Sequence, residues 1–346
     1  MNHAAHFRAY DRVVSLAAAK LPLADLFDEA QQVLRRALPR DSSCWHAMDP
    51  STLIETRYSA ERMPAPTAGI AEIAYLHDDY NSFSSLFKAP RHAGILSEAT
   101  GGELRKSSRY VALLEPVGMT GELRTAFVVD GVPWGCVSFF RQGDFTPEER
   151  DFANVIAPLL GLSFRAAGVH ARAAGPGADL WPGVLVFDGD RRVESHTPST
   201  ARWLEEFGFE GSVTADLLPY EVVSIVERVR LTGQEATARM LGESGQWIQV
   251  HAAPATAATA WDQRVAVVLQ AAAVPSIAPL ISAAYGLTPR ERELTELVLQ
   301  GNDTREIAGR LHLSPHTVQS HLKSIFAKVG VRSRRELVGR ISAQGK

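Results

Sequence analysis

Residues 287–337 read LTPRERELTELVLQGNDTREIAGRLHLSPHTVQSHLKSIFAKVGVRSRREL, and this stretch contains four signals for the start of a helix. In each signal a Ser, Thr or Asp cap is followed by Pro at the first helical position, by Glu three residues on, or by both. The caps are Thr288, Asp303, Ser314 and Ser333. Gly301 and Gly330 stand where helices are expected to end. The stretch therefore predicts a compact all-α domain of four short helices.

The third of these helices, expected over about 315–329, is amphipathic. Its apolar side chains form one stripe at helical spacing, namely Val318, Leu322, Ile325, Phe326 and Val329. The opposite face carries polar and basic side chains, namely His316, Ser320 and Lys323, with Gln319 beside them. A short turn at 311–313 joins this helix to the second one. The two helices predict a helix-turn-helix whose second helix reads DNA in the major groove.

Four motifs of this region resemble the LuxR-type DNA-binding domain of bacterial regulators. They are Leu287-Thr288-Pro289-Arg290-Glu291-Arg292-Glu293, Arg305-Glu306-Ile307-Ala308, Leu313-Ser314-Pro315-His316-Thr317-Val318-Gln319-Ser320-His321-Leu322 and Lys328-Val329-Gly330-Val331-Arg332-Ser333-Arg334. The resemblance covers residues 286–346 without a gap. The family usually carries Thr-Val-Lys where this chain has Thr317-Val318-Gln319, so one cation is missing from the expected groove contact.

The resemblance implies a role for each matching residue. The residues expected to read the DNA bases are Gln319, Ser320 and Lys323. Phosphate contact falls to Thr304, Arg305, His316 and Thr317. Dimerisation falls to the last helix, through Leu337, Val338 and Ile341. An apolar stripe on the N-terminal helix (Phe7, Tyr10, Val14 and Ala17) offers a second dimer contact.

Charge is distributed unevenly along the chain. Residues 286–346 hold 11 Lys and Arg against 6 Asp and Glu, a net +5, and the whole chain is −3, which leaves −8 for residues 1–285. A basic segment on an acidic body suits phosphate binding. An apolar content of 45% with no run near the ~20 residues of a membrane span indicates a soluble, cytoplasmic protein, nucleoid-associated when bound to DNA. Two cysteines fit a reducing compartment.

Two candidate linkers divide the chain. Residues 167–179 are rich in Ala and Gly, and residues 273–285 contain Pro275 and Pro279. We expect the second linker to be a hinge with a short helical stretch leading into Tyr285. The predicted domains are residues 1–166, 180–272 and 286–346.

The first domain is predicted to be α+β. Helices are expected over 6–19 and 24–38, hairpins over 43–58 and 125–140, and a closing helix from 147 to about 164. This order, the hairpin sequence Val-Asp-Gly-Val-Pro-Trp-Gly and the helix start Phe-Thr-Pro-Glu-Glu-Arg resemble a GAF sensor domain over about 21–164. The N-terminal helix is expected to precede the GAF-like part.

The second domain is also predicted to be α+β. A strand over 183–187, a tight Asp-Gly turn and a further strand are followed by helices over 199–207 and 220–231 and strands over 247–253 and 264–270. This order resembles a PAS-like domain. Families of this type often carry Asn after the second strand, where this chain has His196 or Thr197.

Several residues in front of the helical domain have a functional and a structural interpretation. His77-Asp78-Asp79 and His92 suggest a metal or haem ligand, but no second ligand lies at zinc spacing. Cys44 and Cys136 allow a redox switch or two small buried side chains. Residues 107–110 fit a ligand lid or a plain loop. Five aromatic residues fit a pocket or a core, namely Trp45, Tyr75, Tyr80, Phe83 and Phe87. We expect no cofactor and no metal.

The sequence as a whole favours a sequence-specific transcriptional regulator. It would bind double-stranded DNA as a homodimer on two half-sites, respond to an unknown small-molecule effector, and meet RNA polymerase as a further partner. Two alternatives remain: sensor domains that serve only as a dimerisation scaffold, and an enzyme with a DNA-binding appendage. No nucleophile–base constellation or phosphate-binding GxxxxGK[ST] loop favours the enzyme.

Overall fold

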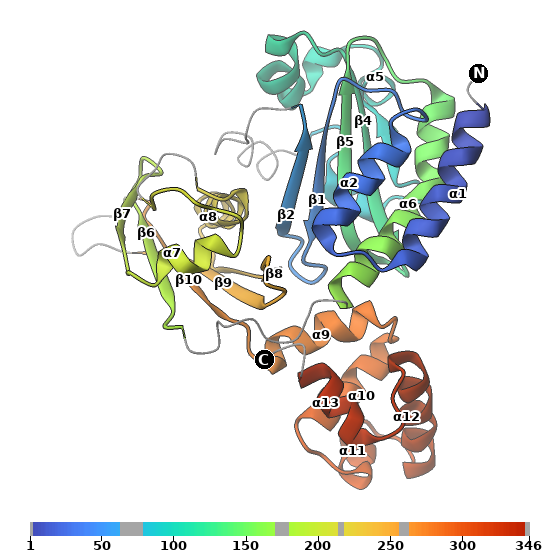
Figure 1. Ribbon diagram of the computed structural model, residues 1–346, viewed down its shortest axis with the longest axis vertical. Helices are drawn as coiled ribbons and strands as arrows, with labels where there is room; N and C mark the ends of the chain where they lie inside the picture. The colour runs from blue at the N-terminus through green and yellow to red at the C-terminus, as the bar shows by residue number, and fades with distance from the viewer. Residues whose placement is uncertain (1–2, 63–78, 170–179, 214–217, 256–262, 343–346) are drawn as a thin grey trace.

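The computed structural model describes residues 3–62, 79–169, 180–213, 218–255 and 263–342. It contains two antiparallel five-stranded sheets, each with its own helices, and a separate group of C-terminal helices (Figure 1). The predicted fold class is therefore confirmed as two α+β parts followed by an all-α part.

The first sheet has the order β2-β1-β5-β4-β3. Its strands are β1 (Ser42–Met48), β2 (Glu55–Glu61), β3 (Ala93–Ile95), β4 (Gly121–Val129) and β5 (Val132–Arg141). The turn between β1 and β2 is built on Asp49, whose Oδ1 accepts the backbone N–H of Ser51 at 3.0 Å. Asp130 and Gly131 adopt positive φ between β4 and β5, as a two-residue hairpin turn requires. Both predicted hairpins are therefore present.

Helices cover the first sheet on one face. The long helices are α1 (His3–Ala19), α2 (Leu23–Leu34) and α6 (Pro147–Val169). Their inward side chains form one core with the sheet, centred on the fully buried Trp45 and Phe127. Short elements lie on the opposite face of the sheet, where they pack against Ala126, Val128 and Phe140, namely α4 (Phe83–Lys88), α5 (Leu96–Thr100), η1 (Leu104–Lys106) and η2 (Tyr110–Leu114), with η3 (Glu115–Val117) following.

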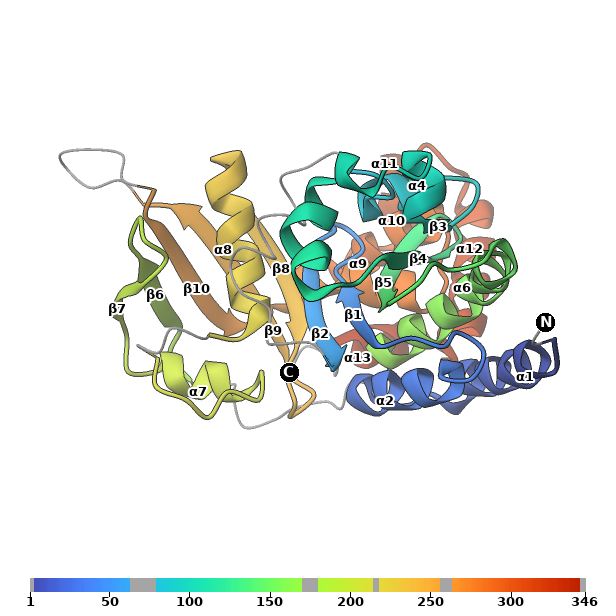
Figure 2. The same cartoon turned by 90° about the horizontal axis from the view of Figure 1, so that it is seen from above.

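The second sheet repeats the same topology in the order β7-β6-β10-β9-β8. Its strands are β6 (Gly183–Phe187), β7 (Val193–His196), β8 (Ala236–Leu241), β9 (Trp247–Pro254) and β10 (Val265–Ala271). Helices α7 (Thr200–Glu205) and α8 (Tyr220–Thr232) pack on it around the buried Trp203. Figure 2 shows the two sheets side by side, with β2 and β8 facing each other across the joint.

A buried ion pair fastens this joint. Arg239 on β8 donates from Nη2 to Asp49 Oδ1 at 2.6 Å and from Nε to Oδ2 at 2.7 Å. Asp49 is fully buried and Arg239 nearly so. Its Nη1 also donates to the carbonyl oxygen of Ser276 at 2.8 Å. Ser276 lies on α9 (Val274–Ala284), so one guanidinium connects the first sheet, the second sheet and α9.

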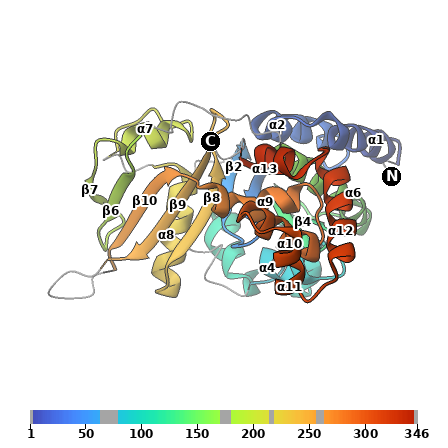
Figure 3. The same ribbon diagram turned by 90° about the horizontal axis from the view of Figure 1, so that it is seen from below.

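The C-terminal helices are α10 (Pro289–Leu299), α11 (Thr304–Arg310), α12 (Pro315–Val329) and α13 (Arg334–Ser342). They share one hydrophobic core with α9. Figure 3, the view from below, shows α9 to α13 lying across the end of the first domain, with α12 on the side away from the second domain.

Glu291 locks α10 against α12. Its carboxylate accepts hydrogen bonds from Ser324 Oγ and from Lys328 Nζ, both at 2.6 Å, and from the backbone N–H of Thr288 at 2.8 Å. Burial alone would raise the pKa of this carboxyl, but the bonds from Lys328, Ser324 and Thr288 outweigh it and lower the pKa to about 2. The charged form of Glu291 is thus part of the folded domain.

Several elements differ from the sequence-based expectations. Strand β8 was not predicted, and residues 274–284, expected to be a hinge with a short helical stretch, form the 11-residue buried helix α9. Helix α2 ends at Leu34 rather than at residue 38, and α6 continues to Val169 rather than to about 164. The boundaries of the three domains remain a prediction, and residues 170–179 of the first linker lie outside the described residues.

We predict that Glu291→Gln destabilises the C-terminal helices at neutral pH and that the effect becomes smaller as the pH falls to 3. A carboxyl whose pKa falls from 4.5 to about 2 on folding stabilises the folded state fully above pH 4.5. That stabilisation, at most about 3 kcal/mol, is lost as the pH falls towards 2. The measurement is hydrogen exchange of the full chain between pH 3 and pH 7, followed in peptides from 288–330.

Glu293→Gln is the matched control, because Glu293 is exposed and pairs only with Arg290 at the surface. Removing it should change stability by less than about 0.5 kcal/mol at every pH. Equal effects of the two substitutions at pH 7 would contradict the role assigned to Glu291.

Candidate nucleic-acid interface

Helices α11 and α12 form the predicted helix-turn-helix. Asp303 caps α11 by accepting the backbone N–H groups of Arg305 and Glu306 at 2.7 and 2.9 Å, and Ser314 caps α12 by accepting that of Thr317 at 3.0 Å. His312 in the turn has φ +53°, which reverses the chain within three residues. Gly330, with φ +72°, ends α12. The capping signals in the sequence therefore fix both ends of α12.

The two faces of α12 are divided as the pattern predicted. Val318, Leu322, Ile325 and Val329 are buried in the domain core, and Phe326 packs partly against it. The side chains of His316, Gln319, Ser320 and Lys323 are exposed on the opposite side. This exposed face, defined by these four residues, is called the α12 face below.

Gln319 has a defined orientation on the α12 face. Its Nε2 donates to Thr304 Oγ1 at 3.1 Å, which links α12 to the first residue of α11. The side-chain oxygen of Gln319 is an acceptor that this bond does not use. The sequence pattern placed Gln319 on this face, but a bond to a residue 15 positions earlier has no local signal.

The four residues predicted to contact phosphate gather at the N-terminal ends of α11 and α12. Thr304 and Arg305 begin α11, and His316 and Thr317 begin α12. Arg305 and His316 are exposed, while Thr304 and Thr317 are partly buried. Thr317 Oγ1 lies 2.8 Å from Ser314 Oγ. Helix N-termini carry partial positive charge, so this arrangement favours an anion near Arg305.

The residues predicted to mediate dimerisation differ in exposure. Leu337 and Ile341 are fully buried in the core that α13 shares with α9, and Val338 is partly exposed. In this arrangement the apolar side of α13 packs in the core that it shares with α9, α10 and α12 of the same chain. On α1, by contrast, Phe7, Tyr10 and Val14 are exposed, with 68% of Phe7 accessible to solvent.

The candidate metal residues have structural roles where the structure describes them. His92 Nδ1 lies 2.8 Å from the carbonyl oxygen of Leu86. Asp79 accepts hydrogen bonds from Ser107 Oγ at 2.7 Å and from the backbone N–H of Arg109 at 2.9 Å. His77 and Asp78 lie outside the described residues. Within the described ranges, no three His, Cys, Asp or Glu side chains are grouped to hold a metal ion.

Residues 107–110 form the start of a helical turn rather than a loop. Arg109 donates to Glu122 from Nε at 3.0 Å and from Nη2 at 2.8 Å, and both side chains are buried. This pairing, together with Asp79, fixes the segment to β4. The arrangement indicates a structural element rather than a ligand lid.

The two cysteines lie on neighbouring strands. Cys44 on β1 is opposite Ser138, and Cys136 on β5 is opposite His46, so the two thiols are diagonal neighbours on one face. Both are free. Burial raises the pKa of Cys44 to about 12 and that of Cys136 well above its usual value. Because the thiolate is the reactive form, these environments favour two inert buried side chains.

The five aromatic residues do not line one pocket. Trp45 is fully buried in the main core, while Phe83 and Phe87 stack on each other over β4 at 6.3 Å between ring centroids. Tyr80 is exposed, and Tyr75 lies outside the described residues. In the described part of the chain, no helix is both long and apolar enough to cross a membrane.

Comparison with known proteins places the C-terminal helices in a family. The family model described as bacterial regulatory proteins, luxR family, matches residues 286–340. The spore germination protein GerE of Bacillus subtilis is 40% identical over 60 residues, which are 17% of this chain and 81% of GerE. A putative HTH-type transcriptional regulator of Mycobacterium bovis is 46% identical over 59 residues. The chain spans only 7% of the length of that mycobacterial relative.

Solved structures are similar to parts of the chain at low identity. VqmA of Vibrio cholerae, in a ligand–DNA complex, is 17% identical over 48% of this chain and 84% of its own, with a TM-score of 0.24. The GAF domain of a phosphoenolpyruvate-protein phosphotransferase from Coxiella burnetii is 13% identical over 48% of this chain and 96% of its own, with a TM-score of 0.32. TM-scores this low carry no functional conclusion.

The residues that match the family model include α10, α11 and α12, the helices that carry and support the α12 face. The mycobacterial relative is named as a transcriptional regulator, and neither it nor GerE is named as an enzyme. Through residues 286–340, the chain belongs to the luxR family of bacterial regulatory proteins.

Proposed function

We propose that the protein is a sequence-specific, DNA-binding transcriptional regulator whose two sensor-like domains receive a small-molecule signal. The observation that carries the proposal is the α12 face: four polar or basic side chains exposed on a helix whose other side is the domain core. Such a helix fits the major groove, which is wide enough to admit it. The net +5 of residues 286–346 supports contact with a polyanion.

Each exposed residue has a role in the proposed complex. Gln319 pairs with adenine, Lys323 with guanine, and Ser320 with either. Four residues hold the phosphate backbone on both sides of the groove and set the register of the protein on the duplex, namely Thr304, Arg305, His316 and Thr317. The Gln319–Thr304 bond orients the reading side chain before DNA arrives, which lowers the ordering cost of binding.

The protein acts on DNA as a dimer in this proposal, in the cytoplasm and at the nucleoid, with RNA polymerase as a further partner. Two-fold symmetric subunits read two half-sites about one helical turn apart, roughly 10 bp. The contacts are α13, where Val338 is already partly exposed, and the exposed stripe Phe7, Tyr10 and Val14 of α1. The acidic front of the chain stays away from the duplex.

Replacing Lys323 by Ala should weaken binding to the target site by about 1–3 kcal/mol and relax the base preference at one position. The measurement is a binding titration against the selected site and its single-base variants at fixed salt. Lys323→Arg is the control, since it keeps a cationic donor for guanine, and it should retain the preference. If Lys323→Ala bound with wild-type affinity and selectivity, the orientation proposed for α12 would be wrong.

Replacing Arg305 by Ala should weaken binding to all DNA sequences alike. One phosphate contact is lost, so the slope of log K against log salt should flatten by about 0.9. Titrations from 50 to 200 mM salt on specific and random duplexes measure both effects, and Arg305→Lys should restore the slope. A loss restricted to one sequence would instead identify Arg305 as a base-reading residue.

Sedimentation of the full-length protein with a palindromic site tests the dimer. We expect a 2:1 complex that weakens sharply when one half-site is scrambled, because half of the base contacts disappear. A 1:1 complex of equal affinity on both duplexes would exclude the two-half-site model.

A further inference from the structure

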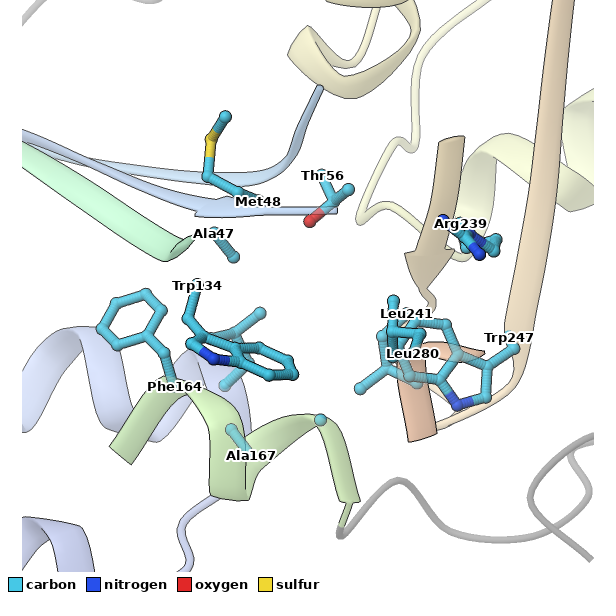
Figure 4. A pocket seen from close by; sticks show the side chains of 12 residues that line it. Ala47, Met48, Thr56, Trp134, Phe164, Ala167, Arg239, Leu241, Trp247 and Leu280 are labelled. Carbon is cyan, nitrogen blue, oxygen red and sulfur yellow. The ribbon is translucent and has the colours of Figure 1, made fainter. Parts of the chain in front are cut away.

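A pocket lies where the first sheet, the second sheet and α9 meet. Figure 4 shows Trp134 and Phe164 of the first domain on one side and Leu241, Leu280 and Trp247 on the other. Leu280 belongs to α9, and Arg239, which binds Asp49 and Ser276, forms part of the wall. Both sheets and α9, the helix that leads from the second sheet to the DNA-binding helices, therefore border this pocket.

The inner pocket is small and continues into a larger groove. Its own volume is about 40 Å³. Leu23, Ala167 and Leu241 line both the pocket and the neighbouring groove, whose volume is about 480 Å³. A volume of ~300–1,000 Å³ is typical of small-molecule sites. The groove also has mostly apolar walls, with a few polar groups at its outer end.

The polar groups left without a partner around these two spaces are hydrogen-bond donors. Trp134 and Trp247, only 4% and 6% exposed, line the pocket, and neither indole N–H has an acceptor among the described residues. Arg57 lines the groove and binds Glu243 through Nη2 at 3.0 Å, while its buried Nη1 has no acceptor in the described part of the chain. A buried donor without an acceptor costs about 1–3 kcal/mol.

We propose that the pocket and groove together bind the effector, and that the effector is a small aromatic molecule carrying acceptor oxygens, such as a carboxylate or carbonyl, and no cationic group. Its ring lies against Trp134 and Leu280, and its oxygens accept from the indole N–H groups and Arg57. A cationic ligand would leave these donors unpaired and would face Arg57.

Binding at this place acts on α9 directly. A ring inserted between Trp134 and Leu280 presses on the helix whose Ser276 carbonyl accepts from Arg239. Because α9 shares its core with α10 to α13, any preference of the ligand for one position of α9 changes the equilibrium of the DNA-binding helices. The effector role rests on the proposed function, whereas occupancy of the groove does not.

The binding test uses the full-length protein without DNA and the fluorescent aromatic sulfonate 1-anilinonaphthalene-8-sulfonate as probe. We expect one saturable site per chain, with the probe displaced by phenylacetate and not by phenethylamine. Leu241→Trp, which fills the groove, should abolish binding. Trp247→Phe, which removes one donor and keeps an aromatic ring, should weaken it about five- to tenfold.

Trp181→Phe is the matched control, because Trp181 is 83% exposed and lies outside the pocket, and it should leave binding unchanged. Thermal unfolding of each variant checks that the fold is kept. Multiple weak probe sites, displacement by phenethylamine, or full binding to a folded Leu241→Trp variant would overturn the proposed site.

A second titration measures DNA affinity with and without saturating probe, and we expect it to change at least threefold. Unchanged affinity in a protein that binds DNA would overturn the effector role. The wild-type protein could also fail to bind DNA and still bind the probe at one site. That result would contradict the proposed function and would still support the proposed binding site.

Discussion

The arrangement of the three parts depends on the buried ion pair between Arg239 and Asp49. Removing two charges from water costs several kcal/mol for each ion, so such a pair is stable only when its hydrogen bonds are satisfied. Here the guanidinium binds both carboxylate oxygens and the carbonyl of Ser276. Breaking any one of these contacts leaves a buried charge poorly solvated. These contacts therefore favour the geometry in which the first sheet, the second sheet and α9 are all joined through Arg239.

A second set of contacts supports the same joint. Tyr220, at the start of α8, donates its hydroxyl to Glu55 on β2, and His46 Nδ1 lies 3.1 Å from the same carboxylate. Burial opposes ionisation of Glu55, but His46 and Tyr220 outweigh it and lower its pKa. These polar contacts orient the second domain on the edge of the first sheet, and apolar contacts accompany them, since Ile54 of the first domain is buried in the core of the second.

The sequence predicted what local rules determine. Capping residues such as Thr288 and Asp303 and the apolar stripe of α12 placed the helix-turn-helix, and the turn at Asp130-Gly131 placed a hairpin. The sequence-based prediction failed for elements whose structure depends on contacts with residues far away in the chain. Strand β8 contains two alanines, a weak strand former, and is held by β9 and Asp49. Helix α9 contains Pro275 and Pro279, which suggested a linker, yet Ile277 and Ile281 anchor it in the C-terminal core. The contact between Glu291 and Lys328 also has no local sequence signal that would predict it.

The packing of α13 within its own chain has a consequence for assembly. Leu337 and Ile341 are buried in the core that α13 forms with α9, α10 and α12, and a tethered surface of this kind acts at an effective concentration in the millimolar range. A second subunit at micromolar concentration cannot displace this intramolecular packing by binding to the apolar side of α13 alone. Two chains already held on adjacent half-sites, however, also meet at high local concentration. Assembly through α13 would then follow DNA binding rather than precede it, and the free protein in solution would be monomeric at this face.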